Sequence, residues 1–149
     1  FTEGLLQTIE AMGVTRAAVQ LEVGLGTFLP VEAETLEAHP MHVETYAVPV
    51  PTVVALRKQR AKGGRIVVIG TTAVRTLETV AGQVLEGLAP PAELRGETNL
   101  KIMPGFGFRL TDLLVTNFHL PRSTLMALVG AMVGVARLKE LYALAIREG

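Results

Sequence analysis

Residues 65–82 read R-I-V-V-I-G-T-T-A-V-R-T-L-E-T-V-A-G, and this stretch decides the fold. After one arginine comes a continuous apolar run, a pattern typical of a buried parallel strand. The glycine and two threonines that follow predict a tight turn, and the remainder has the length and composition of a helix. A strand, a turn and a helix in this order indicate the repeating unit of layered α/β domains.

The segments upstream predict two further helices and two strands. Apolar side chains recur at helical spacing after Thr2, a candidate N-cap, and Gly13 stops the pattern. Two stretches alternate apolar with polar residues, which is the mark of half-buried strands. The expected elements are a helix over 2–12, strands over 15–23 and 41–48, and a helix from Pro51 to about Lys62.

Downstream, the composition changes. Residues 89–99, A-P-P-A-E-L-R-G-E-T-N, contain the turn-forming residues of a surface loop. Two apolar stretches predict strands at 100–103 and 110–115, and residues 122–145 predict one or two helices with a glycine interruption. The order of elements therefore predicts a layered α/β domain, with a mixed or parallel sheet flanked by helices.

Composition limits the class of protein. A length of 149 residues suits one domain with a substantial core. The longest apolar run, residues 125–136, is 12 residues long, whereas a bilayer span needs roughly 18–20. We therefore expect no membrane span and a cytoplasmic protein. The chain has no cysteine, and its 14 basic residues balance 14 acidic ones, so it lacks the basic excess of a free-standing nucleic-acid binder.

Two glycine turns follow predicted strands. At the Gly70 turn, backbone N–H groups and the helix dipole favour an anion, which Thr71, Thr72 and Arg75 would complete as a phosphate or carboxylate site. Equally, one of the two threonines simply caps the helix. The turn lacks both the P-loop lysine and the full G-x-G-x-x-G pattern.

The second turn comprises Gly24, Leu25, Gly26, Thr27 and Phe28. Its glycines would let a ligand approach the backbone, because they have no side chains. A hairpin or bulge explains these glycines at least as well.

Polar residues near position 40 offer acid–base chemistry. His39, His42 and Glu44 lack the H-x-x-x-H pairing of the common zinc hydrolases, so we expect no metal site. On a strand over 41–48, His42, Glu44 and Tyr46 would share one face. We therefore expect a His42–Glu44 pair that tunes a general base or binds a polar substrate.

Asn117 and His119 close a predicted strand just before a helix start near Pro121. Burying either side chain without a partner would cost roughly 1–3 kcal/mol or more. Ligands bind at strand ends in α/β sheets, which makes both residues binding candidates, and His119 a second candidate base. Equally, they tie the loop to backbone groups.

Five motifs together resemble one family. They are V-G-L-G-T-F-L-P-V, H-P-M-H-V-E-T-Y, G-G-R-I-V-V-I-G-T-T-A-V-R-T-L-E-T, P-G-F-G-F and T-N-F-H-L-P-R-S-T-L-M, in order over most of residues 20–130. The sequence resembles the QueA family, the S-adenosylmethionine:tRNA ribosyltransferase-isomerases of queuosine synthesis. The resemblance implies that residues 1–149 are the C-terminal part of the α/β catalytic domain of a larger two-domain enzyme. The family's N-terminal part, inserted β-barrel domain and short aromatic-rich C-terminal segment are not in this sequence.

The resemblance also implies a reaction. The family moves the ribosyl moiety of S-adenosylmethionine onto 7-aminomethyl-7-deazaguanine at the wobble position of tRNA anticodons, giving epoxyqueuosine-tRNA, adenine and methionine. S-adenosylmethionine is then a substrate, and no cofactor or metal is expected; the protein is expected to be a monomer. The expected roles are a catalytic base at His42 with Glu44 or at His119, a nucleoside pocket at Gly24, Gly26, Thr27 and Phe28, an anion grip at Thr71, Thr72 and Arg75, and ribose or base positioning by Asn117.

Two other functions remain open. One is a nucleotide-binding hydrolase or transferase that uses the Gly70 turn as an anion site for a small substrate. The other is a non-catalytic tRNA-binding domain. A requirement for tRNA would distinguish the expected transferase from the enzyme that acts on a small substrate. Formation of product would distinguish it from the non-catalytic tRNA-binding domain.

Overall fold

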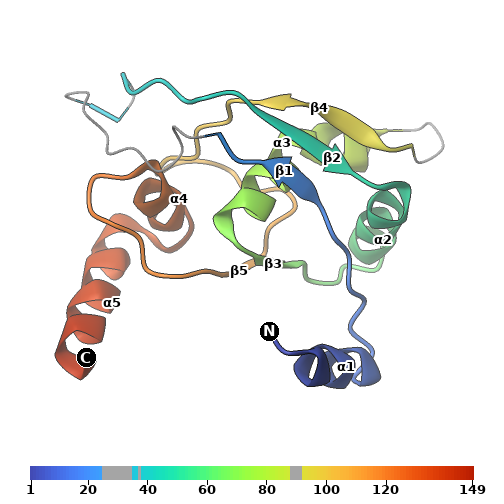
Figure 1. Cartoon of the computed structure of the whole chain (residues 1–149), viewed down its shortest axis with the longest axis horizontal. Helices are drawn as coiled ribbons and strands as arrows, with labels where there is room; N and C mark the ends of the chain where they lie inside the picture. The colour runs from blue at the N-terminus through green and yellow to red at the C-terminus, as the bar shows by residue number, and fades with distance from the viewer. Residues whose placement is uncertain (25–34, 37, 88–91) are drawn as a thin grey trace.

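The computed structural model describes residues 1–24, 35–36, 38–87 and 92–149 of the chain (Figure 1). Within these ranges, helices and strands alternate along most of the chain. In order they are α1 (Glu3–Ala11), β1 (Gln20–Glu22), β2 (Glu44–Val48), α2 (Val50–Ala61), β3 (Val67–Ile69), α3 (Thr71–Glu86), β4 (Leu94–Thr98), β5 (Leu113–Val115), α4 (Thr124–Val133) and α5 (Val135–Glu148).

Helix α3 lies at the centre of the fold. The antiparallel sheet β1-β2-β4 is on one side of it and the parallel pair β3-β5 on the other (Figure 1). Because α3 is enclosed by other elements, it is buried on more than one face, and its apolar residues form much of the core. The buried apolar residues of α3 are Val74, Leu77, Val80, Ala81 and Val84.

The structure confirms the strand–turn–helix predicted over residues 65–82. β3 is followed by Gly70, whose φ of 88° lies in a region that suits glycine, and α3 begins at the next residue. The α/β class is also confirmed, with the strands divided between two small sheets. The expected parallel component is the pair β3–β5, joined from Val67↔Leu113 to Ile69↔Val115.

Upstream, the predicted elements are present but the strands are shorter. The α1 helix is capped as expected, because the Thr2 hydroxyl accepts a hydrogen bond from the Leu5 N–H at 3.3 Å. The strand expected over 15–23 is formed only by β1, and the strand expected over 41–48 begins at Glu44. The second difference matters for the site, because it leaves His42 outside the strand.

Two predictions downstream were wrong. Residues 89–99 were expected to be loop, yet they contain β4, which pairs with all of β2. Gly96 belongs to this strand. A Cβ at this position would come within 2.9 Å of the Tyr46 hydroxyl, so the glycine leaves space for the Tyr46 side chain and does not mark a turn. Residues 100–103 were expected to form a strand, but they form none. The Leu100 carbonyl accepts its hydrogen bond from Arg75 Nε and not from the backbone of a neighbouring strand.

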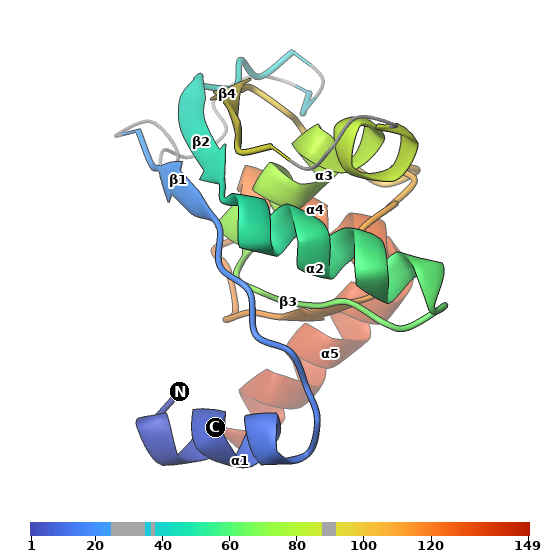
Figure 2. The ribbon, with the colours of Figure 1, turned by 90° about the vertical axis from the view of Figure 1, so that its right-hand side faces the viewer.

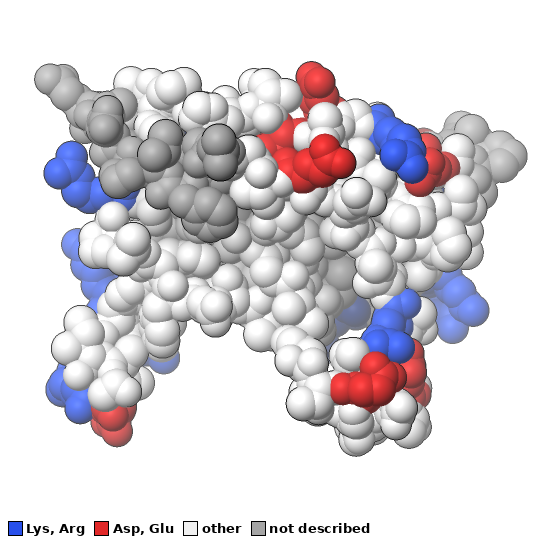
Figure 3. All heavy atoms as spheres, viewed as in Figure 1, with Lys and Arg blue, Asp and Glu red and all other residues white. Residues whose placement is uncertain are grey.

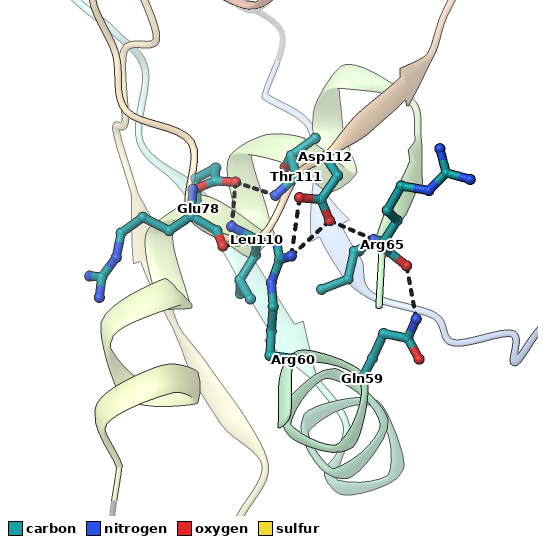
Figure 4. A network of polar contacts seen from close by, with 9 residues as sticks. Gln59, Arg60, Arg65, Glu78, Leu110, Thr111 and Asp112 are labelled. Carbon is teal, nitrogen blue, oxygen red and sulfur yellow. Dashed lines mark hydrogen bonds and ion pairs between the residues drawn. The ribbon is translucent and has the colours of Figure 1, made fainter. Parts of the chain in front are cut away.

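A buried carboxylate holds the segment that leads into β5 (Figure 4). The Glu78 side chain, on α3, accepts hydrogen bonds from three successive backbone N–H groups. The Arg109 N–H donates to Oε2 at 2.8 Å. The N–H groups of Leu110 and Thr111 donate to Oε1 at 3.0 and 2.8 Å. Charge-assisted bonds of this kind are stronger than neutral ones. Glu78 therefore fixes β5 against the central helix.

A second carboxylate joins the two parallel strands at their start (Figure 4). Asp112 accepts a hydrogen bond from the Ile66 N–H at 2.6 Å and pairs with Arg60 of α2 at 2.8 Å. Partial burial acts to raise the pKa of Asp112, but the Ile66 N–H and the Arg60 guanidinium outweigh it and hold the pKa below its ordinary value. Asp112 is therefore a structural anchor for β3 and β5.

The described residues cover one face of the parallel pair and leave the other exposed. Val68 is buried and Leu114 half-buried, whereas four neighbouring side chains are exposed on the strands' other face. They are Val67, Ile69, Leu113 and Val115. Helices α1 and α5 both project from the body on the side where β3 and β5 lie (Figures 1 and 2). No helix in the described part of the chain is long and apolar enough to cross a membrane.

Candidate functional site

The carboxyl ends of β3 and β5 meet at one edge of the parallel pair. Ile69 pairs with Val115, and the Gly70 N–H extends the pairing by donating to the Val115 carbonyl at 2.9 Å. The residues that follow each strand therefore start side by side. The structure thus brings the Gly70 turn and the Asn117–His119 loop to the same edge, the place where α/β sheets bind ligands.

Within the described part of the chain, no side chain caps the start of α3. Gly70 is the N-cap residue and lacks a side chain that could accept a capping hydrogen bond. Thr71 and Thr72 are the first two helical residues. The alternative that one of these threonines caps the helix is therefore wrong. Thr71 is buried and Thr72 half-buried. An uncapped helix start directs N–H groups and positive dipole outward, which suits an anion.

Arg75 lies one turn further along α3, roughly 6 Å from Thr71 along the helix axis. Its guanidinium forms a buried ion pair with Glu44, and its Nε donates to the Leu100 carbonyl at 3.2 Å. Arg75 and Glu44 are only 4% and 2% exposed. A buried charge requires such a partner, so the charge of Arg75 is compensated inside the protein.

The same ion pair changes the expected role of Glu44. Its carboxylate is bound to Arg75 in the core, whereas His42 is exposed and lies two residues before β2. The expectation that His42, Glu44 and Tyr46 share one strand face was wrong for His42, because the strand does not extend that far. Glu44 and Tyr46 do share one face of β2, as the alternation predicted, and both are buried on it.

His42 and Gly24 lie at the same end of the antiparallel sheet. Glu22, the last residue of β1, pairs with Thr45 of β2, so Gly24 follows β1 where His42 precedes β2. Gly24 is half-buried. The Glu44–Arg75 pair connects this end of the sheet to the first half of α3, and through it to the Gly70 turn. The predicted pocket residues Gly26, Thr27 and Phe28 lie outside the described residues.

His119 is held in place by three polar contacts. Its Nε2 lies 3.1 Å from the Thr116 hydroxyl, and the Tyr142 hydroxyl bonds both to its backbone N–H and to its carbonyl. Partial burial lowers the pKa of His119 below the ordinary 6.5. The shift favours the neutral imidazole, the form that a general base needs. The side chain of Asn117, two residues before, is exposed.

Tyr142 is a site residue that the sequence did not reveal. It lies in α5, and it also lines an apolar cavity of about 660 Å³ between α4 and α5, with Arg122 and Lys139 among the lining residues. A tyrosine at helical spacing in an amphipathic helix is typical of a core residue, so the sequence pattern contained no signal for its contact with His119.

Charge is dispersed over the face shown in Figure 3. Lysine and arginine atoms lie in separate groups toward its margins, some beside acidic atoms, and most of its lower centre is uncharged. The described residues on this face therefore form no continuous basic track of the kind that follows a nucleic-acid backbone.

Comparison with known proteins gives a consistent result. A family model described as "Queuosine biosynthesis protein" matches residues 1–149. Over 149 residues the chain is 49% identical to an S-adenosylmethionine:tRNA ribosyltransferase-isomerase of Acidiphilium cryptum, and over 148 residues 46% identical to one of Chlorobium chlorochromatii. These matches cover 100% and 99% of this chain but 42% and 43% of the relatives.

A solved structure agrees with these matches. The crystal structure of an S-adenosylmethionine tRNA ribosyltransferase from Thermotoga maritima has a TM-score of 0.78 and 42% sequence identity to the chain. The match covers 99% of this chain and 45% of that one. The chain thus spans less than half the length of the relatives it matches, and the fold described above corresponds to one part of those relatives.

Proposed function

The chain belongs to the queuosine biosynthesis protein family, and from this membership we propose that it forms part of an S-adenosylmethionine:tRNA ribosyltransferase-isomerase. The observation that carries the proposal is the match of the whole chain, at 46% and 49% identity, to two relatives that bear this name. Because the chain spans under half of them, the activity is proposed for the complete protein, to which these residues contribute one face of the site.

The proposed reaction joins S-adenosylmethionine to a modified tRNA. The ribosyl moiety is transferred to the aminomethyl nitrogen of 7-aminomethyl-7-deazaguanine at the wobble position and isomerised, which gives epoxyqueuosine-tRNA. Adenine and methionine leave. Both substrates are proposals for this chain, drawn from the family resemblance.

The first chemical step needs a base. The positive sulfonium acidifies the adjacent ribose carbon, so removal of a proton there starts a sequence in which adenine departs and the substrate amine attacks. His119 suits this role, because its partial burial lowers its pKa and favours the neutral imidazole that can accept a proton. If its Nε2–H donates to the Thr116 hydroxyl, Nδ1 has a lone pair free to accept the proton. His42, exposed at the neighbouring sheet end, is the second candidate.

The remaining residues would bind the substrates. The uncapped start of α3, at Thr71 and Thr72, would receive a phosphate of the tRNA or the methionine carboxylate. Arg75 would support this site indirectly, since its charge is paired with Glu44. Asn117 would orient a ribose or base, and Gly24, Gly26, Thr27 and Phe28 would form the nucleoside pocket. Cofactor and metal are not part of the proposed chemistry.

The test uses the natural full-length protein that carries this sequence. It is incubated with S-adenosylmethionine and tRNA that bears 7-aminomethyl-7-deazaguanine, and the released adenine is measured by chromatography. Adenine release that requires the modified tRNA supports the proposal. Folded protein that releases none, or releases it equally without tRNA, contradicts it; tRNA binding without release would favour a non-catalytic domain instead.

Histidine variants then identify the base. We expect His119→Ala to lower turnover on the order of 100-fold, the usual contribution of general base catalysis. The chain has three histidines, and His39→Ala is the matched control because His39 is half-buried like His119 and has no proposed role. If the double variant at His42 and His119 keeps turnover within a few-fold of wild type, neither is the base.

A further inference from the structure

One hydroxyl from the last helix holds the backbone of the His119 loop. Tyr142 Oη accepts a hydrogen bond from the His119 N–H at 2.7 Å and donates one to the His119 carbonyl at 2.9 Å. The two bonds fix the peptide groups on both sides of the His119 Cα, while the Thr116 hydroxyl contacts the ring at Nε2. Backbone and ring are thus held by different partners.

Tyr142 is itself firmly placed. Its ring packs edge-on against Phe118, with ring centroids 5.1 Å apart and planes at 86°. One turn earlier on α5, Leu138 is buried against Gly130 of α4, where an added Cβ would lie 3.4 Å from Leu138 Cδ2. Gly134, with a φ of 85°, sets the turn between the two helices. The hydroxyl therefore reaches His119 from a rigid support.

We propose that Tyr142 is a positioning residue for His119, which it holds at the carboxyl end of β5 so that the imidazole faces the reacting carbon. The catalytic part of this inference rests on the proposed function, in which His119 accepts a proton. Without the hydroxyl, the loop between β5 and α4 keeps the Ser123–Leu120 bond and the Thr116–His119 contact but loses the two bonds that fix the His119 backbone. A displacement of about 1 Å at such a group is enough to reduce turnover on the order of 100-fold.

The direct variant is Tyr142→Phe in the natural full-length protein. It removes only the hydroxyl and keeps the ring that packs on Phe118. We expect kcat for adenine release to fall on the order of 10- to 100-fold, with KM for S-adenosylmethionine changed by less than a few-fold. The matched control is Tyr46→Phe, the same change at the other of the two tyrosines, which should leave kcat near wild type. A Tyr142→Phe enzyme with wild-type kcat overturns the proposal.

A double variant separates positioning from general stabilisation. If Tyr142 acts only by positioning His119, then Tyr142→Phe should have no further effect in a His119→Gln enzyme, which already lacks the base. The Tyr142→Phe, His119→Gln enzyme should therefore be no slower than His119→Gln alone. A further loss that multiplies the two single effects would show that Tyr142 supports the fold and not His119.

A spectroscopic measurement tests the geometry without any turnover. The ring resonances of His119 are followed by NMR through a pH titration in wild type and in Tyr142→Phe. We expect the resonances to move and the titration midpoint to rise toward 6.5, as the released loop becomes hydrated. Identical curves would refute the hold on His119. A wild-type enzyme that releases no adenine would defeat the proposed function, but the NMR comparison would still decide this inference.

Discussion

The Glu78 carboxylate offers the sharpest test of how the fold is held together. Glu78→Gln keeps the shape of the side chain, and its carbonyl can still accept from Leu110 and Thr111 at the Oε1 position. The amide NH2 then takes the Oε2 position and faces the Arg109 N–H, so two donors meet where a bond existed. One charge-assisted bond is lost and two become neutral.

The magnitude follows from these bonds. A hydrogen bond to a charged group contributes about 1.5–3 kcal/mol and a neutral one about 0.5–1.5 kcal/mol. The amide is easier to bury than the carboxylate, which offsets part of the loss, so we expect a net destabilisation of about 2–3 kcal/mol. At about 2–4 °C per kcal/mol for a protein of this size, the melting temperature should fall by at least 4 °C.

The assay combines thermal unfolding with amide hydrogen exchange. Exchange at Arg109, Leu110 and Thr111 should accelerate in Glu78→Gln more than exchange elsewhere in the core. Glu86→Gln is the matched control, since Glu86 lies on the same helix but is exposed and, among the described residues, pairs with the Arg109 side chain. Its melting temperature should equal that of wild type. If the two variants behave alike, the three N–H bonds do not hold β5, and the reasoning fails.

Three further predictions concern the site and its supports. Glu44→Gln leaves the buried guanidinium of Arg75 without a countercharge and should cost about 3–5 kcal/mol in urea unfolding; a loss below 1 kcal/mol would mean that the pair is not closed in solution. The folded-state pKa of Asp112 is lowered, so its contribution to stability is present above about pH 3.9 and is lost as the pH falls below it. Asp112→Asn should therefore flatten the acid side of the stability curve, and an unchanged acid limb would count against the anchor. Gly70→Ala places a Cβ at a φ of 88° and should cost about 1–3 kcal/mol by calorimetry, whereas an unaltered melt would show that the turn relaxes freely.

The sequence predicted the elements whose local patterns agree with their surroundings. The strand, turn and helix of residues 65–82 combine an apolar run, a glycine and a helical pattern, and all three are present. The sequence also predicted that the Gly70 turn and the Asn117–His119 loop each follow a strand. That the two segments meet at one edge is known only from the pairing of β3 with β5.

The failures occurred where a distant contact decides the structure. Gly96 reads as a turn residue, yet it lies in a strand because the Tyr46 ring occupies the space above it. Glu44 reads as a partner for His42, but Arg75 on the central helix binds it in the core. Tyr142 lies 23 residues from His119, and nothing in its local pattern marks the contact. Such pairings depend on how helices pack, which periodicity does not specify.

The hold of Tyr142 on position 119 has a practical consequence, because both of its bonds run to the backbone. A change of the side chain at this position leaves the peptide groups, and therefore the hydroxyl's partners, in place. His119→Ala would then remove the ring and keep the loop that presented it, with a vacancy of imidazole shape beside the Thr116 hydroxyl. Added imidazole can enter such a vacancy and restore part of the lost rate. Chemical rescue is therefore expected because the loop stays in place when the side chain is removed.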